Sequence, residues 1–280
     1  MREIDASIII SNIKEMCIEA NLYLSNDIES AVKKAFDTEK NELGKKIIGQ
    51  LIENLEIADK DQIPICQDTG MAIVFVKLGQ DVHVTGMNLT DAINEGVRQG
   101  YVEGYLRKSV VKDPIIRENT KDNTPAIIHY DIVEGENIEI TVAPKGFGSE
   151  NMSRMYMLKP ADGVEGIKKS VVEAVSMAGP NACPPFVVGV GIGGNFEKAA
   201  ILAKTALTRD INTHHPDEHI KALEEDLLNE INALGIGPAG LGGSNTALAV
   251  NIETFATHIA GMPCAINMCC HVNRHSRRTI

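Results

Sequence analysis

Residues 160–207 read PADGVEGIKKSVVEAVSMAGPNACPPFVVGVGIGGNFEKAAILAKTAL and contain a helix pattern, a strand pattern and a second helix pattern. Hydrophobic residues recur at helical spacing in the first part, at Val164, Ile167, Val171 and Val175. With Pro160 suited to the first turn, this spacing predicts a helix from Pro160 to about Ala178. The apolar run FVVGVGIGG predicts a buried strand, and the alanine-rich residues 195–207 predict a further helix. This succession favours a mixed α/β fold.

The rest of the chain extends the same alternation. Helical spacing occupies much of the first third, at Ile9, Ile13, Met16 and Ala20 and again at Leu43, Ile47, Leu51 and Leu55. A buried strand, AIVFVKLG, is predicted after Gly70, and a helix over 89–106. AIIHYDIV and NIEITVAP, separated by residues 134–136, predict a β-hairpin.

The C-terminal part predicts one more long helix, beginning at Pro216 and stopping at Gly235, and then strands that end in a basic tail over 274–278. No linker, low-complexity block or internal repeat interrupts the chain. We therefore expect one domain over residues 1–280, α/β in class, with a helical N-terminal third and helices packed around a mixed sheet.

Composition limits the classes of function. The chain has 280 residues, of which 44% are hydrophobic, enough for a sizeable core. Its net charge of -11 and its 4% of aromatic residues disfavour nucleic acid as a partner. We find neither a signal-peptide pattern nor an apolar run long enough to span a bilayer, and therefore expect a cytoplasmic protein with no membrane partner.

The six cysteines raise the question of metal binding rather than disulfides. They are Cys17, Cys66, Cys183, Cys264, Cys269 and Cys270. No pair has the spacing of a zinc ribbon or a ferredoxin, so a closed site of four local cysteines is disfavoured. If a metal binds, three remote thiolates would converge on it and leave one coordination position open, as catalysis requires.

Two cysteines lie in informative local sequences. Residues 65–70, ICQDTG, place a thiol, an amide, a carboxylate and a hydroxyl before a glycine, so this loop could hold a metal beside an acid; the alternative is a polar turn with one buried cysteine. Cys183 precedes two prolines, which is typical of iron–sulfur ligands but also of rigid connections. Cys269 and Cys270 are adjacent, so in a strand they would point to opposite faces and only one would serve as a ligand.

Two glycine runs, GVGIGG and GIGPAGLGG, admit more than one interpretation. The first fits a dinucleotide-binding fingerprint, but no second apolar strand ending in an acidic residue follows its helix. Close approach to a small anionic ligand and tight packing are the alternatives for both runs.

The histidines give weaker signals. His215 and His219 have the spacing of a zinc-binding helix face, but Pro216 lies between them and we expect exposed histidines near a helix start. His258 lies in an apolar stretch, as either a core histidine or an active-site histidine.

Five sequence segments, taken in order, resemble a known family. They are CQDTG, KGFGSEN, ACPPFVVGVGIGG, GIGPAGLGGSNTALAVN and THIAGMPCAINMCCHVNRH, and they span residues 66–275. Together they resemble the N-terminal domain of class I fumarate hydratases and the alpha subunit of L(+)-tartrate dehydratases. The resemblance implies a 4Fe-4S cluster on Cys66, Cys183 and Cys270, where the count back from Arg274 selects Cys270 over Cys269.

The resemblance also implies the substrate site. Asp68 corresponds to the residue that protonates the departing hydroxyl, and His258 to an active-site histidine. Substrate contacts are implied for Gln67, Arg107, Gly146 and Gly148. Phe147 stands where fused fumarases often carry another glycine, so the fit is incomplete there.

The implied reaction is reversible hydration of fumarate to (S)-malate, with dehydration of L(+)-tartrate as the alternative. The implied partners are a small dicarboxylate and a beta subunit, in an α2β2 heterotetramer. A hypothesis of another class is a non-catalytic iron–sulfur sensor or scaffold. Such a protein would need the cysteines but not Asp68, Arg107 and His258.

Overall fold

The computed structural model describes residues 1–280, which form two compact units. Unit 1 comprises Met1–Ser25, Leu55–Phe147 and Arg274–Ile280, and unit 2 comprises Asn26–Asn54 and Gly148–Asn273. Both contain helices and strands, so the predicted α/β class is confirmed, as is the helical N-terminal third. The assignment of residues 1–280 to one domain stays a prediction. None of the helices combines the length and the apolar character needed to cross a membrane.

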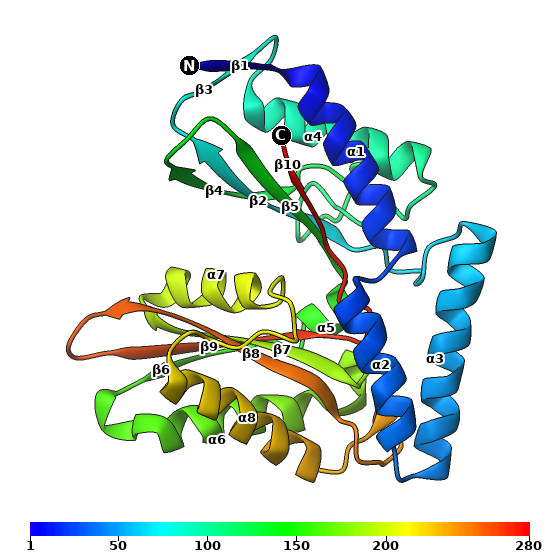
Figure 1. The fold of residues 1–280 in the computed structure, drawn as a ribbon, viewed down its shortest axis with the longest axis vertical. Helices are drawn as coiled ribbons and strands as arrows, with labels where there is room; N and C mark the ends of the chain where they lie inside the picture. The colour runs from blue at the N-terminus through cyan, green and yellow to red at the C-terminus, as the bar shows by residue number, and fades with distance from the viewer. The chain divides into compact units, whose positions relative to one another are not determined.

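Unit 1 contains a four-stranded sheet with helices on one face. Its elements are β1 (Arg2–Asp5), α1 (Ala6–Leu22), β2 (Met71–Gly79), β3 (Val82–Thr85), α4 (Leu89–Glu103), β4 (Ile127–Val133), β5 (Ile138–Lys145) and β10 (Ser276–Thr279), with the end of α3 (Glu42–Asp61). The sheet order is β10-β5-β2-β4, and β1 pairs with β3 separately. In Figure 1, α1 and α4 cover the sheet side by side, and their buried faces share a core with β2 and β5.

The predicted hairpin of β4 and β5 is wrong, because β2 lies between these strands. Val74 of β2 is opposite Ile128 in a parallel pairing and opposite Val142 in an antiparallel one. The connection between β4 and β5 crosses the end of β2, where the backbone nitrogen of Gly79 donates to the carbonyl oxygen of Asn137 at 2.9 Å. A Cβ on Gly79 would lie 2.4 Å from the carbonyl oxygen of Gly135, so only glycine admits this crossing.

Unit 2 contains a four-stranded sheet with helices on both faces (Figure 1). Its elements are α2 (Asn26–Thr38), the start of α3, most of α5 (Phe147–Glu150), β6 (Arg154–Leu158), α6 (Gly163–Ala178), β7 (Phe186–Gly194), α7 (Phe196–Ala206), α8 (Glu218–Ala233), β8 (Ala247–Thr257) and β9 (Met262–Cys269). The order is β6-β9-β7-β8, with β7 and β8 parallel and the other pairs antiparallel. Figure 1 shows α7 on one face and α6 and α8 on the other. The predicted α6, β7, α7 and α8 are thus confirmed, with two later starts. The α-helix α6 begins at Gly163, after a 3-10 helix over Pro160–Asp162, and α8 begins at Glu218, two residues after Pro216.

The first glycine run serves helix packing. Gly189 and Gly191 lie inside β7, not in a loop before a helix. A Cβ on Gly189 would be 2.2 Å from the carbonyl oxygen of Ala203, and one on Gly191 would be 2.1 Å from that of Ala199. The absence of side chains lets α7 lie directly against β7. This packing favours the structural explanation over a dinucleotide site.

The second glycine run ends beside the Glu39 side chain, which is 6% exposed. The Glu39 carboxylate accepts hydrogen bonds from the backbone nitrogens of Asn41, Ser244 and Asn245 at 2.9, 2.9 and 3.0 Å. A Cβ on Gly243 would be 2.7 Å from Glu39 Oε1. Burial raises the pKa of Glu39, but these hydrogen bonds outweigh it and lower the pKa to about 2.

Replacing Glu39 by glutamine is expected to lower the free energy of unfolding by about 2 kcal/mol at pH 7, because hydrogen bonds to a buried charge are lost. Since the folded-state pKa of Glu39 lies below its ordinary value of 4.5, this contribution is present above about pH 4.5 and disappears as the pH falls toward 2. Chemical denaturation at pH 7 and at low pH measures both effects. Glu42→Gln, at an exposed position of α3, is the control. Equal stability of the two variants at pH 7 would contradict the prediction.

Candidate functional site

The CQDTG segment forms the connection from α3 to β2 in unit 1. Cys66 and Asp68 are partly exposed, Gln67 is exposed and Thr69 is buried. The loop ends at Gly70, whose φ of +76° places it in the left-handed region. A Cβ there would lie 2.7 Å from the backbone nitrogen of Lys145, so glycine is required for the loop to pass the end of β5.

Two backbone amides fix the carboxylate of Asp68. Oδ1 accepts from the nitrogen of Gly70 at 3.0 Å, and Oδ2 accepts from the nitrogen of Phe147 at 2.9 Å. A Cβ on Gly146 would be 3.2 Å from Asp68 Oδ2, so a larger residue would crowd the acid. The structure thereby brings together two predicted site residues, Asp68 and Gly146.

Arg107 is tied to the same loop through Thr69. The Thr69 hydroxyl accepts from the backbone nitrogen of Arg107 at 2.9 Å and lies 3.3 Å from its carbonyl oxygen, to which it donates. Arg107 itself is exposed. The residue predicted to bind a carboxylate is therefore held beside the immediate neighbour of Asp68.

Three buried residues that were not predicted from the sequence donate hydrogen bonds to backbone carbonyl oxygens of the CQDTG loop. The Tyr101 hydroxyl donates to the carbonyl oxygen of Thr69 at 2.8 Å, and burial raises the pKa of Tyr101. The Asn123 amide donates to the carbonyl oxygen of Gly70 at 3.1 Å. Arg274 donates through Nη2 to the carbonyl oxygen of Asp68 and through Nε to that of Pro144 at 3.4 Å.

The prediction that residues 274–278 form a basic tail is wrong. Arg274 is only 4% exposed, and the residues after it form β10, which pairs with β5. The only sequence feature that marked Arg274 was its position four residues after Cys270, and we used that spacing only to choose Cys270 over Cys269 as a cluster ligand.

Two predicted cluster ligands lie on adjoining loops of unit 2. Cys183 follows the 3-10 helix Gly179–Ala182 with a φ of +54°, and it is exposed. Its carbonyl oxygen accepts from the backbone nitrogen of His271 at 3.4 Å and lies 3.1 Å from His271 Nδ1. Cys270 directly precedes His271 and is the first residue after β9. The Cys183 and Cys270 segments are therefore joined by hydrogen bonds.

Exposure divides the six cysteines into two groups. None of them is disulfide-bonded. Cys17, Cys264 and Cys269 are buried, and burial raises the pKa of the Cys17 and Cys264 thiols to about 12. The other three, Cys66, Cys183 and Cys270, are at least partly exposed. Because iron is bound by thiolates, the accessible group fits an iron–sulfur ligand set better than the buried group.

The remaining predicted residues are exposed in unit 2. Gly148 lies on α5, and His258 lies in the turn between β8 and β9, where its Nδ1 accepts from the nitrogen of Ala260 at 3.2 Å. His258 is thus not a core histidine, and its active-site role stays a prediction.

The expectation of two exposed histidines is wrong for one of them. His215 is 9% exposed, with Nδ1 accepting from the nitrogen of Asp217 at 3.1 Å and Nε2 lying 3.3 Å from the Thr254 hydroxyl. His219 is exposed, as expected. These bonds hold the start of α8 next to β8 and explain why His215 is buried.

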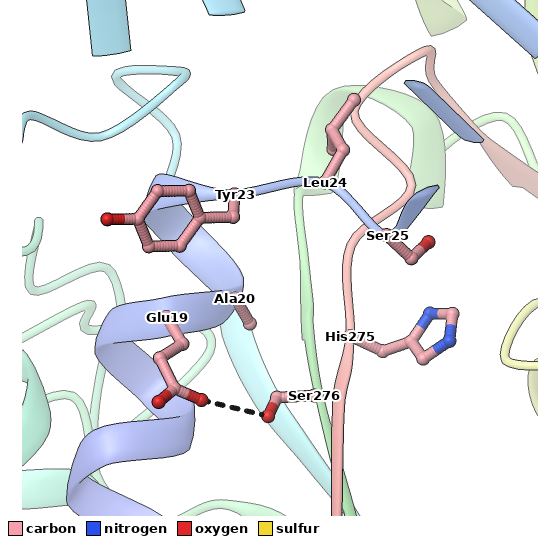
Figure 2. Close-up of a pocket in the computed structure, with 7 residues that line it drawn as sticks. All are labelled: Glu19, Ala20, Tyr23, Leu24, Ser25, His275 and Ser276. Atoms are coloured by element: carbon pink, nitrogen blue, oxygen red, sulfur yellow. Dashed lines mark hydrogen bonds between the residues drawn. The ribbon is translucent and has the colours of Figure 1, made fainter. Parts of the chain in front are cut away.

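A hollow of about 310 Å³ lies in unit 1 beside the end of α1, but it contains none of the predicted site residues. Figure 2 shows its lining, formed by Glu19, Ala20, Tyr23, Leu24, Ser25, His275 and Ser276. The Glu19 carboxylate accepts from Ser276 at 3.3 Å and from Arg278 at 2.5 Å. A wall that contains a carboxylate suits a dicarboxylate poorly.

Comparison with known proteins explains the combination of a CQDTG loop, an Asp68 fixed by amides and a pair of joined cysteine loops. The family model described as Fumarate hydratase (Fumerase) matches residues 10–279. The chain belongs to this family. Members of the Fumerase family are hydro-lyases, so the predicted enzyme class is confirmed at that level.

Relatives of this Fumerase family member carry the names of tartrate enzymes. A Methanocaldococcus jannaschii protein provisionally named L(+)-tartrate dehydratase subunit alpha is 45% identical over 272 residues, which cover 95% of each chain. The L(+)-tartrate dehydratase subunit alpha of Escherichia coli K12 is 34% identical over 254 residues, covering 90% of this chain and 84% of the relative. Both relatives are named for L(+)-tartrate and not for fumarate.

Proposed function

We propose that this chain is the alpha subunit of a hydro-lyase that dehydrates L(+)-tartrate. The observation that carries the proposal is the 45% identity to a tartrate-named relative along 95% of both chains. Fumarate hydration is the second candidate, supported by the description of the matching family model. The two substrates belong to one chemical class, small dicarboxylates related to an alkene by loss of water.

The proposed cofactor is a 4Fe-4S cluster held by Cys66, Cys183 and Cys270. Support comes from the exposure of these three thiols and from the hydrogen bonds that join the Cys183 and Cys270 segments. Cys269 is a poorer third ligand because it is 5% exposed and lies opposite Val187 within the sheet. When bound, the cluster would supply a Lewis-acidic iron that makes the substrate hydroxyl a better leaving group.

Asp68 would move the proton that leaves with the hydroxyl. Its carboxyl is oriented by the amides of Gly70 and Phe147, which leaves further lone pairs for the substrate. Hydroxyl and proton depart as water, and the C–H bond on the neighbouring carbon breaks to form the double bond. We expect the base for that carbon-bound proton to come from the partner subunit. For tartrate the product is an enol, which tautomerises to oxaloacetate.

Other residues of this chain would bind the substrate. Arg107 would hold one carboxylate by paired N–H donors, a geometry that lysine does not reproduce. Gln67 is exposed next to Asp68, and Gly146 lets the backbone approach closely. Gly148 and His258 are assigned to the site by the family resemblance.

The proposed partner is a beta subunit in an α2β2 heterotetramer. Its support is the term "subunit alpha" in the names of the relatives. The alternative of a non-catalytic iron–sulfur sensor is disfavoured by the set of hydrogen bonds that hold Asp68 and Arg107 at one loop, because a sensor has no use for that arrangement.

Steady-state kinetics of the anaerobically purified alpha–beta complex test this proposal. We expect kcat/KM for L(+)-tartrate to exceed that for (S)-malate and fumarate by about 10²-fold or more, because a site that hydrogen-bonds the second hydroxyl rejects a substrate lacking it. Preference for fumarate would establish the second candidate instead. Turnover of neither acid would contradict the proposed function.

A further inference from the structure

Asn123 is a fully buried residue that joins the Arg107 segment to the Asp68 loop. Its Oδ1 accepts from the backbone nitrogens of Ser109 and Val110 at 2.6 and 3.2 Å, and its Nδ2 donates to the carbonyl oxygen of Gly70 at 3.1 Å. The side-chain amide of Asn123 thus accepts through its oxygen from two backbone N–H groups and donates through its nitrogen to a backbone carbonyl oxygen. Asparagine alone provides both at this side-chain length.

The backbone at Asn123 is also suited to asparagine. Its φ of +62° lies in the left-handed region, which asparagine, aspartate and glycine adopt more readily than other residues. Glycine at this position would therefore remove the amide without adding backbone strain. Aspartate would keep the size and the acceptor but turn a carboxylate oxygen toward the Gly70 carbonyl.

Two side chains connect the Arg107 segment to the Asp68 loop. Thr69 bonds to the backbone of Arg107 itself, and Asn123 bonds to the amides of Ser109 and Val110, two and three residues after Arg107. The nearby bond from Asn119 to the carbonyl oxygen of Lys108 ties the segment only to its own loop. Loss of the Asn123 amide would leave Thr69 as the link on which the position of Arg107 relative to Asp68 depends.

We propose that Asn123 is a positioning residue, which sets the separation of Arg107 from Asp68 and thereby selects dicarboxylates whose carboxylate and hydroxyl match that separation. The proposal rests on the proposed function, in which Arg107 and Asp68 contact the substrate. Asn123 itself touches neither substrate nor cofactor.

Kinetics of Asn123→Gly and Asn123→Asp in the anaerobically purified alpha–beta complex provide the first test. We expect KM for L(+)-tartrate to rise about 10-fold or more while kcat changes by less than about 3-fold, because ground-state and transition-state binding by Arg107 weaken together. Lys121→Gly is the matched control, since Lys121 is exposed in the same loop and has a φ of +71°. It should leave both constants unchanged.

A double-mutant cycle separates positioning from general destabilisation. If Asn123 acts through Arg107, Asn123→Gly should add little to the rise in KM already caused by Arg107→Ala. Full additivity of the two effects would overturn the proposal. So would a fall in kcat with KM unchanged.

Amide hydrogen exchange tests the positioning without relying on turnover. Exchange at Ser109 and Val110 should be faster in Asn123→Gly than in the unaltered complex and in Lys121→Gly. Unchanged exchange at both amides would overturn the proposal even if the kinetics changed. Absence of dicarboxylate turnover in the unaltered complex would instead refute the proposed function, and exchange would still decide whether Asn123 holds this segment.

Discussion

Asp68→Asn in the anaerobic alpha–beta complex is expected to lower kcat by about 10²- to 10⁴-fold, the usual contribution of a positioned acid or base. The amide cannot deliver the proton that leaves with the hydroxyl. Iron and sulfide content should stay unchanged, because Asp68 is not among the proposed ligands. Steady-state kinetics and metal analysis of the same preparation measure both effects.

A matched control for Asp68→Asn is available in the same unit. Asp113 also accepts two backbone hydrogen bonds, from Ile115 at 2.8 Å and Ile116 at 2.6 Å, and these bonds lower the pKa of its carboxyl. Asp113→Asn therefore removes a similarly bonded carboxylate from an exposed loop outside the proposed site. Comparable losses of kcat in the two variants would show that the effect of Asp68→Asn is structural. Full activity of Asp68→Asn would remove Asp68 from the mechanism.

Cys183→Ser is expected to abolish the cluster and with it essentially all turnover. Serine oxygen is a harder ligand than thiolate and binds iron of such clusters poorly. The purified complex should lose its brown colour and its acid-labile sulfide. An active variant with a full complement of iron would remove Cys183 from the ligand set.

Buried cysteines supply the controls for the cluster assignment. Cys17→Ala removes a fully buried thiol whose pKa is raised to about 12, so it should retain the cluster. The pair Cys269→Ala and Cys270→Ala tests the third ligand. We expect loss of iron only in Cys270→Ala, and loss in Cys269→Ala alone would reverse that choice.

Local periodicity was sufficient to predict most individual elements. The helices α6 and α8 and the strand β7 follow from apolar spacing within each segment, and packing did not override it. The order of strands was not predictable in the same way. β4 and β5 are separated by a turn-like sequence, but the strand between them, β2, comes from more than 45 residues earlier in the chain.

Sequence reasoning predicted the residues that would contact the substrate, but not the buried residues that hold them in place. Asp68, Arg107 and Gly146 lie in recognisable segments, and the structure holds all three near one loop. Asn123 and Arg274 act through bonds to backbone carbonyls 53 and 206 residues away in sequence. No local pattern encodes such a partner, so only the fold reveals these residues.

Iron and acid-labile sulfide in the alpha–beta complex, purified and assayed under nitrogen, test the central claim most directly. We expect equal amounts of iron and sulfide, at one 4Fe-4S cluster per alpha chain, in a complex that dehydrates L(+)-tartrate. A colourless, iron-free complex with full hydro-lyase activity would contradict it.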